Sequence, residues 1–199
     1  MAAVLTPLND DLSPNHAAWL DHSRDLMAQG CNGLAVLGTT SEANSFSLSE
    51  RLAMLDALGE SDVDSGLSVP GVGCCALPDT VELCRKALEI GAAGVLMLPP
   101  FYYKPASDDG LFAAYSEIIQ RVGDSKLKIL IYHIPQNTGV PITLPLIENL
   151  VTAYPDTVVG IKDSAGDFAN MQAMVENFPD FNVFSGSDAY LLDILRIGG

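Results

Sequence analysis

The stretch Val158-Val-Gly-Ile-Lys-Asp-Ser-Ala-Gly166 contains an apolar, β-branched run that ends on a lysine. A continuous apolar run of this length is typical of a parallel strand buried on both faces, so a strand is predicted over Val158 to Lys162. A lysine in such a run is costly to desolvate unless it is paired or its pKa falls, and a neutral amine can attack a carbonyl carbon. The alternative is that Lys162 has passed the end of its strand and lies in solvent. Lys162 is therefore a candidate Schiff-base nucleophile.

The other four lysines are less well placed for this chemistry. Lys86 lies among polar positions of a predicted helix, and Lys104 lies in an open loop of Tyr, Pro, Ser and Asp after a strand. Lys126 and Lys128 precede a strand, at the end opposite the usual catalytic face of a parallel α/β protein.

Apolar strands and amphipathic helices are predicted to alternate along the whole chain. The predicted strands are Ala2–Pro7, Gly33–Gly38, Leu67–Gly73, Gly94–Leu98, Ile129–Ile134, Val158–Lys162 and Asn182–Ser185. The predicted helices are His16–Gln29, Leu48–Leu58, Thr80–Ile90, Leu111–Val122, Leu144–Ala153, Phe168–Asn177 and Tyr190–Arg196. This alternation indicates an α/β protein with a parallel sheet, either a doubly wound open sheet or a (β/α)8 TIM barrel.

Two features favour the barrel. No Gly-x-Gly-x-x-Gly turn follows the first strand, and polar side chains follow several successive strands, as they do around a barrel mouth. These are Thr39, Thr40, Tyr102, Tyr103, Tyr132, Lys162 and Ser185 to Asp188. The last residues, Ile197-Gly-Gly, are typical of a turn from a helix into a strand. We therefore expect residues 1–199 to form a single barrel domain, truncated before strand eight and the C-terminal helices.

Composition narrows the class of partner. The 199 residues are 48% hydrophobic. The chain has 25 Asp and Glu and only 10 Lys and Arg, which gives a net charge of -15. This charge argues against nucleic acid or an anionic membrane as a partner. A basic segment followed by an apolar one is not seen at the N-terminus, nor is an apolar run of about 18 residues, so we expect neither secretion nor membrane spanning. The four cysteines, which lack metal-ligand spacing, are expected to be buried thiols of a reducing, cytoplasmic compartment; they are Cys31, Cys74, Cys75 and Cys84.

Three motifs in order carry a resemblance to a known family: Gly38-Thr-Thr-Ser-Glu42, Tyr132-His-Ile-Pro135 and Gly160-Ile-Lys-Asp163. With them, the chain resembles the dihydrodipicolinate synthase / N-acetylneuraminate lyase family, which are pyruvate-dependent class I aldolases on (β/α)8 barrels. The resemblance implies a lyase that joins pyruvate to a small aldehyde or cleaves a 2-keto acid, without cofactor or metal, as a homodimer or homotetramer. A dihydrodipicolinate synthase-like activity is the leading expectation. The alternatives are a related 2-keto sugar-acid or aromatic aldolase, or a catalytically inert barrel fragment.

The resemblance also implies roles for individual residues. Lys162 would form the imine with pyruvate, and Tyr132 would relay protons; on its own, Tyr132 would be interpreted as an aromatic plug at the barrel end. Thr39 and Thr40 would hold the pyruvate carboxylate, in a turn before a helix that opens with the capping box Ser47-x-x-Glu50. Without the resemblance, an ordinary loop is the better interpretation of the two threonines.

Two further positions match the family at the pocket. Tyr103 matches a tyrosine that reaches across a subunit interface into the proton relay, and Tyr102 is the alternative if the loop is shifted by one residue. Gly186 matches a backbone position that lines the pocket. Asp163 follows Lys162 directly, so on a strand it should point to the opposite face and be structural.

The sequence departs from the family at two informative positions. Asn137 stands where the synthases carry an arginine for the carboxylate of aspartate semialdehyde, and a neutral amide lacks that charge-assisted bidentate contact. Asn137 is therefore a candidate substrate-binding residue whose amide argues against aspartate semialdehyde as the substrate. His133 stands where asparagine is common, and it is expected to be a structural histidine that faces away from the pocket.

Overall fold

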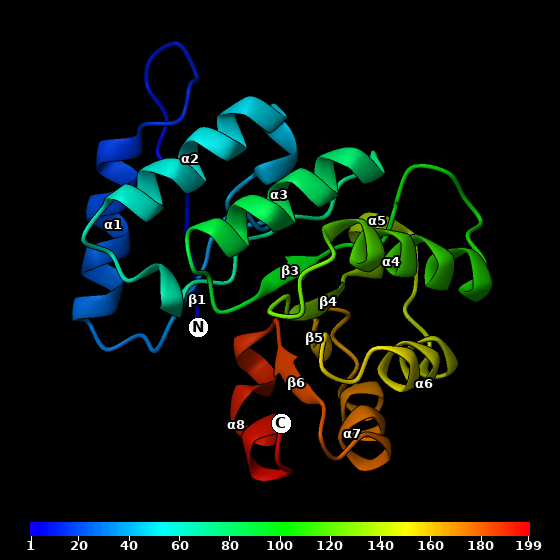
Figure 1. The fold of residues 1–199 in the computed structure, drawn as a ribbon. Coiled ribbons are helices and arrows are strands. Elements are labelled where there is room, and N and C mark those ends of the chain that lie inside the picture. The colour runs from blue at the N-terminus through cyan, green and yellow to red at the C-terminus, as the bar shows by residue number, and fades with distance from the viewer. The chain divides into compact units, whose positions relative to one another are not determined.

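The computed structural model describes all 199 residues (Figure 1). These residues form two compact units. The first unit contains residues 1–72 and 78–96, and the second contains residues 73–77 and 97–199. The expectation of a single domain stays a prediction.

The first unit is built on a short parallel strand pair surrounded by helices. Strand β1 (Ala2–Ala3) pairs in parallel with β2 (Leu34–Ala35). The unit's other elements are α1 (His16–Ala28), η1 (Ala43–Ser45), α2 (Leu48–Glu60), η2 (Ser65–Leu67), most of α3 (Leu77–Glu89) and the start of β3 (Val95–Met97). Its core contains the fully buried side chains of Val4, Trp19, Leu34, Met54 and Leu55.

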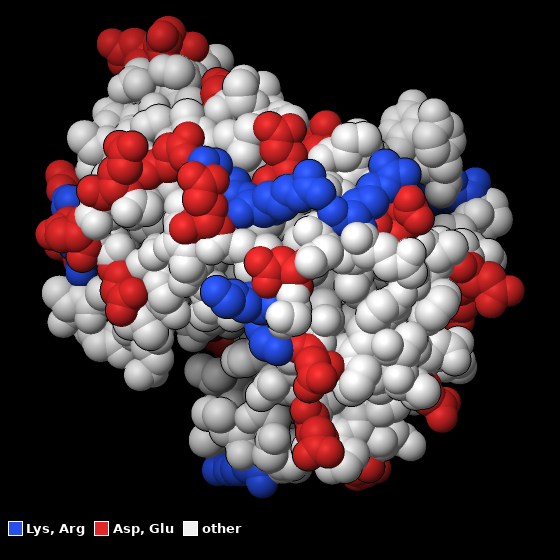
Figure 2. Space-filling model, in the orientation of Figure 1, with Lys and Arg blue, Asp and Glu red and all other residues white.

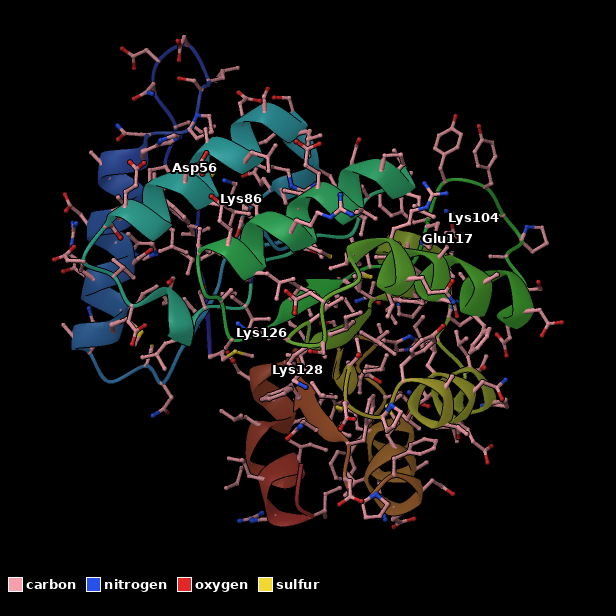
Figure 3. The ribbon with its side chains drawn as sticks, viewed as in Figure 1. Asp56, Lys86, Lys104, Glu117, Lys126 and Lys128 are labelled. Carbon is pink, nitrogen blue, oxygen red and sulfur yellow. The ribbon has the colours of Figure 1, made fainter.

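Local signals in the sequence fix the position of helix α2. The predicted capping box is confirmed, because Ser47 accepts a hydrogen bond from the Glu50 backbone while the Glu50 side chain accepts one from the Ser47 backbone. Between α2 and α3, Lys86 forms salt bridges with Asp56 and with Glu89, each at 2.8 Å; Figure 3 labels Lys86 and Asp56. These carboxylates raise the pKa of Lys86, which is thereby a structural cation.

The predicted strand over Leu67–Gly73 is only partly right. Leu67 ends the turn η2, and the segment after it forms isolated parallel bridges in place of a continuous strand. The backbone N–H groups of Val69 and Gly71 still donate to β2 and its extension at 2.8 Å. Pro70 has no N–H to donate, so the segment cannot form a complete ladder.

The second unit contains a parallel sheet in the order β3-β4-β5-β6, to which β3 contributes Met97. The other strands are β4 (Ile129–His133), β5 (Val158–Asp163) and β6 (Asn182–Ser185). The helices are α4 (Asp108–Val122), α5 (Pro135–Thr138), α6 (Leu144–Ala153), α7 (Phe168–Asn177) and α8 (Leu191–Arg196), with the turn η3 (Asp188–Tyr190) before α8. The predicted bounds of α6, α7 and β6 are confirmed.

The centre of this sheet is apolar, as the continuous hydrophobic runs predicted. Ile131, Ile161 and Val183 lie on adjacent strands and are almost completely buried. Figure 1 shows α4, α6 and α7 beside these strands. Because all strands are parallel, their carboxyl ends lie at one edge of the sheet, together with the loops that follow them.

The expectation of four buried thiols is wrong for three of them. Cys84 is buried in α3, but Cys31 and Cys74 are half-buried and Cys75 is exposed. The reason is that Cys74 and Cys75 lie in the connection before α3 and not inside a strand. None of the four forms a disulfide. No helix combines the length and the apolar character needed to cross a membrane.

Candidate active site

Three side chains form a row across the sheet of the second unit. Lys162 on β5 pairs in register with Tyr132 on β4 and with Phe184 on β6. Residues paired in this way on neighbouring strands project from the same face of a sheet. Lys162 therefore lies between two aromatic residues. Tyr132 could be predicted from the sequence as a site residue, but Phe184 could not, because strand register is not visible in the sequence.

The contact between Lys162 and Tyr132 defines the candidate site. The Lys162 Nζ donates a hydrogen bond to the Tyr132 hydroxyl oxygen at 3.5 Å and lies 4.6 Å from the centroid of the same ring. Tyr132 is only 4% exposed, and Lys162 is half-buried. The Lys162 amine is thus neither free in solvent, which was the alternative interpretation, nor neutralised by a carboxylate. Such an amine, beside a phenol that can donate or accept a proton, suits addition to a carbonyl carbon.

Gly160, two residues before Lys162 on the same strand, allows the neighbouring strands to pack closely against β5. A Cβ at position 160 would lie 2.8 Å from Leu130 Cδ2 and 2.5 Å from the backbone oxygen of Asn182. Only glycine allows β4 and β6 to approach β5 so closely here. Close packing of the strands therefore explains why the Gly160-Ile-Lys-Asp163 motif begins with glycine.

Asp163 and His133 are structural, as predicted. The Asp163 carboxylate is buried and accepts hydrogen bonds from the Ala165 backbone N–H at 2.7 Å and from the Asn170 amide at 2.9 Å. The His133 Nδ1 accepts a hydrogen bond from the Ile142 backbone N–H at 3.1 Å. Burial lowers the pKa of His133, and the nearby Asp163 charge partly opposes that shift.

The lowered pKa of His133 predicts a loss of stability in mild acid. The unfolded chain keeps the ordinary, higher pKa, so below about pH 6.5 it binds the proton more readily than the folded chain does, and the free energy of unfolding falls. We expect His133→Asn, whose amide oxygen can still accept from Ile142, to lose less stability than the wild type between pH 7.5 and 5.5. Urea unfolding at both values measures the difference. His22→Asn is the control, and equal acid losses in wild type and His133→Asn would contradict the prediction.

The turns after β5 and β6 are held together by backbone hydrogen bonds. The Gly186 N–H donates to the Asp163 carbonyl at 2.7 Å, and the Ser164 N–H donates to the His133 carbonyl at 2.8 Å. The Gln136 side-chain amide donates to the Ser164 carbonyl at 2.7 Å, which ties α5 to the turn after β5. The exposed Gly186 is thereby fixed at the edge of the sheet where Lys162 lies.

Gly186→Ala should destabilise the fold through direct overlap with this turn. The added Cβ would lie 1.9 Å from Ser164 Oγ and 2.9 Å from Ser164 Cβ, so rotation of the hydroxyl alone does not remove the clash. We expect a loss of about 1–3 kcal/mol in the free energy of unfolding, measured by urea titration. Adding Ser164→Gly should recover most of it in a double-mutant cycle. Strictly additive losses would show that the overlap is not the cause.

Helix α5 was not predicted, although its signals are present in the sequence. Pro135 occupies its first turn, and Gly139, with φ of 65°, ends it. Both residues are typical of these helix positions. The helix places Asn137 in an exposed position directly after the carboxyl end of β4. Four-residue helices are easily missed because they are too short to show a hydrophobic period.

Within the second unit, no hydrogen bond or ring contact joins Lys162 to Tyr102, Tyr103 or Asn137. Tyr102 and Tyr103 form an edge-to-face pair, with ring centroids 5.1 Å apart, in the loop before α4, and Tyr103 is 86% exposed. Thr39 and Thr40 belong to the first unit, where they are exposed in the turn after β2. That turn is anchored by the buried Ser41, whose hydroxyl donates to the Val4 carbonyl at 2.6 Å.

Comparison with known proteins places this geometry in a family. The model of the dihydrodipicolinate synthetase family matches residues 1–199. The chain belongs to that family. The predicted family and the (β/α)8-barrel fold class are thereby confirmed.

Members of the dihydrodipicolinate synthetase family align with the whole of this chain. An uncharacterized DapA-like lyase of Chloroflexus aurantiacus is 34% identical over 203 residues, which cover 100% of this chain and 66% of that protein. The crystal structure of dihydrodipicolinate synthase from Agrobacterium tumefaciens superposes with a TM-score of 0.95 at 32% identity, covering 100% of this chain and 69% of that one.

A third match is a prophage protein of the same family from E. coli K12, solved in complex with pyruvate. Its TM-score is 0.87 at 26% identity, and the match covers 99% of this chain and 66% of that one. The chain thus spans just under two thirds of the length of the Chloroflexus relative.

Proposed function

We propose that this protein is a Schiff-base lyase in which the Lys162 amine binds pyruvate covalently. The observation that supports this most directly is the position of Lys162 Nζ, 3.5 Å from the Tyr132 hydroxyl, on the penultimate residue of the parallel strand β5. Membership of the dihydrodipicolinate synthetase family and the pyruvate complex of a related protein support the same chemistry.

The proposed reaction begins with addition of the Lys162 nitrogen to the keto carbon of pyruvate. Loss of water gives a protonated imine, whose nitrogen accepts electrons when a proton leaves the adjacent methyl carbon. The resulting enamine carbon attacks the aldehyde carbon, and the aldehyde oxygen takes up a proton. Water then hydrolyses the imine, which restores the Lys162 amine. Read backwards, the same steps cleave a 2-keto acid and release pyruvate.

Tyr132 is proposed to carry protons in these steps. Its hydroxyl is within hydrogen-bond reach of the Lys162 nitrogen, and a phenol can donate in one step and accept in the next. We further propose that Thr39 and Thr40 hold the pyruvate carboxylate, and that Gly186 lines the pocket.

The proposed assembly is a cytoplasmic homodimer or homotetramer. Its basis is Tyr103, whose exposed ring matches the tyrosine that extends the proton relay across a subunit interface in the family. Tyr102, in the same loop, is the alternative candidate for this tyrosine of the proton relay.

Reductive trapping tests the covalent step. The protein is incubated with pyruvate and sodium borohydride, digested, and mapped by peptide mass spectrometry. We expect a permanent adduct on the peptide that contains Lys162, and none when pyruvate is left out. A folded preparation without an adduct would favour the other hypothesis from the sequence, a catalytically inert barrel fragment.

The second substrate is proposed to be an aldehyde, with aspartate semialdehyde, the reaction of a 4-hydroxy-tetrahydrodipicolinate synthase, as the leading candidate. Relatives with that name are 30–31% identical to this chain. A related 2-keto sugar-acid or aromatic aldolase is the alternative, because Asn137 offers an amide in place of a guanidinium. A panel of aldehydes with pyruvate decides between them by the ratio of kcat/KM values.

A further inference from the structure

Lys104 is an unpaired cation in a strongly acidic protein. Its ammonium group forms no ion pair or hydrogen bond in the structure, whereas Lys86, Lys128 and Lys162 each have a partner. The chain has 25 acidic side chains against 10 Lys and Arg, and Figure 2 shows red carboxylates spread over the drawn surface. Such a surface repels small anions, so an anionic substrate needs a local positive charge.

The Lys104 side chain packs against the end of helix α5. A Cβ built on Gly139 would lie 2.8 Å from Lys104 Nζ, 3.1 Å from Cδ and 3.2 Å from Cε, so the lysine stem runs directly over the Gly139 backbone. Figure 3 labels Lys104 beside the loop that precedes α4. The absence of a side chain at position 139 leaves room for this arrangement, and any larger residue there would displace the ammonium group.

This cation lies at the same end of the sheet as the candidate nucleophile. The loop that contains Lys104 follows β3, and α5 follows β4 directly after His133, so both are at the carboxyl end of the parallel strands. The Lys162 amine and the Tyr132 hydroxyl belong to the strands that end there. Helix α5, four residues or about 6 Å long, begins two residues after the end of β4, carries the exposed amide of Asn137, and ends at Gly139, on which Lys104 packs.

We propose that Lys104 is a specificity-determining residue that binds the anionic group of the second substrate. This proposal rests on the proposed function and deepens it. The substrate class is an aldehyde with a carboxylate or a phosphate at the end remote from its carbonyl carbon. The Asn137 amide can donate a hydrogen bond to the same group, while Lys104 supplies the charge.

A purely structural role for Lys104 makes a different prediction. A lysine over the end of α5 can interact with the last helical carbonyl groups and steady the loop. In that case its loss would affect anionic and neutral aldehydes equally and would lower the melting temperature. A role in binding affects only the anionic aldehydes.

The test compares matched aldehydes with pyruvate in the wild type and in Lys104→Met. Succinic semialdehyde against butanal probes the carboxylate, and glyceraldehyde 3-phosphate against glyceraldehyde probes the phosphate. We expect kcat/KM to fall about 10- to 100-fold for at least one anionic member and less than twofold for its neutral partner. Lys104→Arg should restore most of the activity, because it restores the charge. The pair that responds identifies the anionic group.

The controls separate this proposal from the proposed function. Lys126→Met removes the same charge at an exposed position at the other end of the strands and should leave all ratios unchanged. Pyruvate trapping on Lys162 is measured in every variant. If the wild type formed no trapped pyruvate adduct on Lys162, the proposed function itself would be overturned. Normal trapping with equal losses for anionic and neutral aldehydes, or with none, would overturn only the role of Lys104.

Discussion

Lys162→Met is expected to abolish the borohydride-trapped pyruvate adduct and to lower turnover by roughly 10⁴-fold or more, the scale on which enzymes lose activity with their nucleophile. Methionine keeps an unbranched side chain of similar length beside Tyr132 but offers no nitrogen. The sheet should remain intact, because Ile161 and Asp163, on the opposite face of β5, carry the buried packing and the turn hydrogen bonds.

Two measurements make this result decisive. Far-ultraviolet circular dichroism and a melting curve show whether Lys162→Met is folded. Lys126→Met, which removes an exposed lysine before β4, should be trapped as the wild type is. If Lys162→Met still gave an adduct on another peptide at the wild-type rate, the amine of Lys162 would not be the nucleophile.

Tyr132→Phe is expected to separate binding from turnover. The ring that lies 4.6 Å from the Lys162 nitrogen is kept, so pyruvate binding and the equilibrium yield of adduct should be almost unchanged. Only the hydroxyl 3.5 Å from that nitrogen is lost, and with it the proton relay. We expect kcat to fall about 100-fold, the usual scale for a positioned acid–base group. Steady-state kinetics with pyruvate and the best aldehyde of the panel measure this.

Tyr115→Phe is the matched control for loss of a buried tyrosine hydroxyl. The Tyr115 hydroxyl donates to the Met97 carbonyl at 3.2 Å within the core of the second unit. Its removal should cost about 1 kcal/mol of stability and leave turnover unchanged. A Tyr132→Phe enzyme within twofold of the wild-type kcat would exclude Tyr132 from the proton relay.

Much of the fold could be predicted because its strands are buried on both faces. Parallel burial makes each strand a continuous apolar run, and the amphipathic helices between them show their own period. The elements α6, α7 and β6 were therefore predicted to the residue. The segment Leu67–Gly73 was predicted less well, because its apolar composition is that of a strand while Pro70 and the turn η2 prevent a full ladder.

Of the candidate site, the sequence indicated Lys162 and Tyr132 through their place at the ends of apolar runs and through the family resemblance. It could not indicate Phe184 or Lys104. Phe184 lies beside Lys162 only through the register of β6 with β5. In the sequence Lys104 is only a loop residue, because its packing on Gly139 is a contact between residues 35 positions apart in the chain.

The sequence by itself determined the order of strands and helices, the family, and the lysine with nucleophilic potential, because burial pattern and local motif are properties of short segments. Only the tertiary structure decided which side chains stand beside that lysine and where an unpaired positive charge lies. Those relations depend on strand register and on close backbone approach at residues such as Gly139 and Gly160, and both are set by packing between segments far apart in the chain.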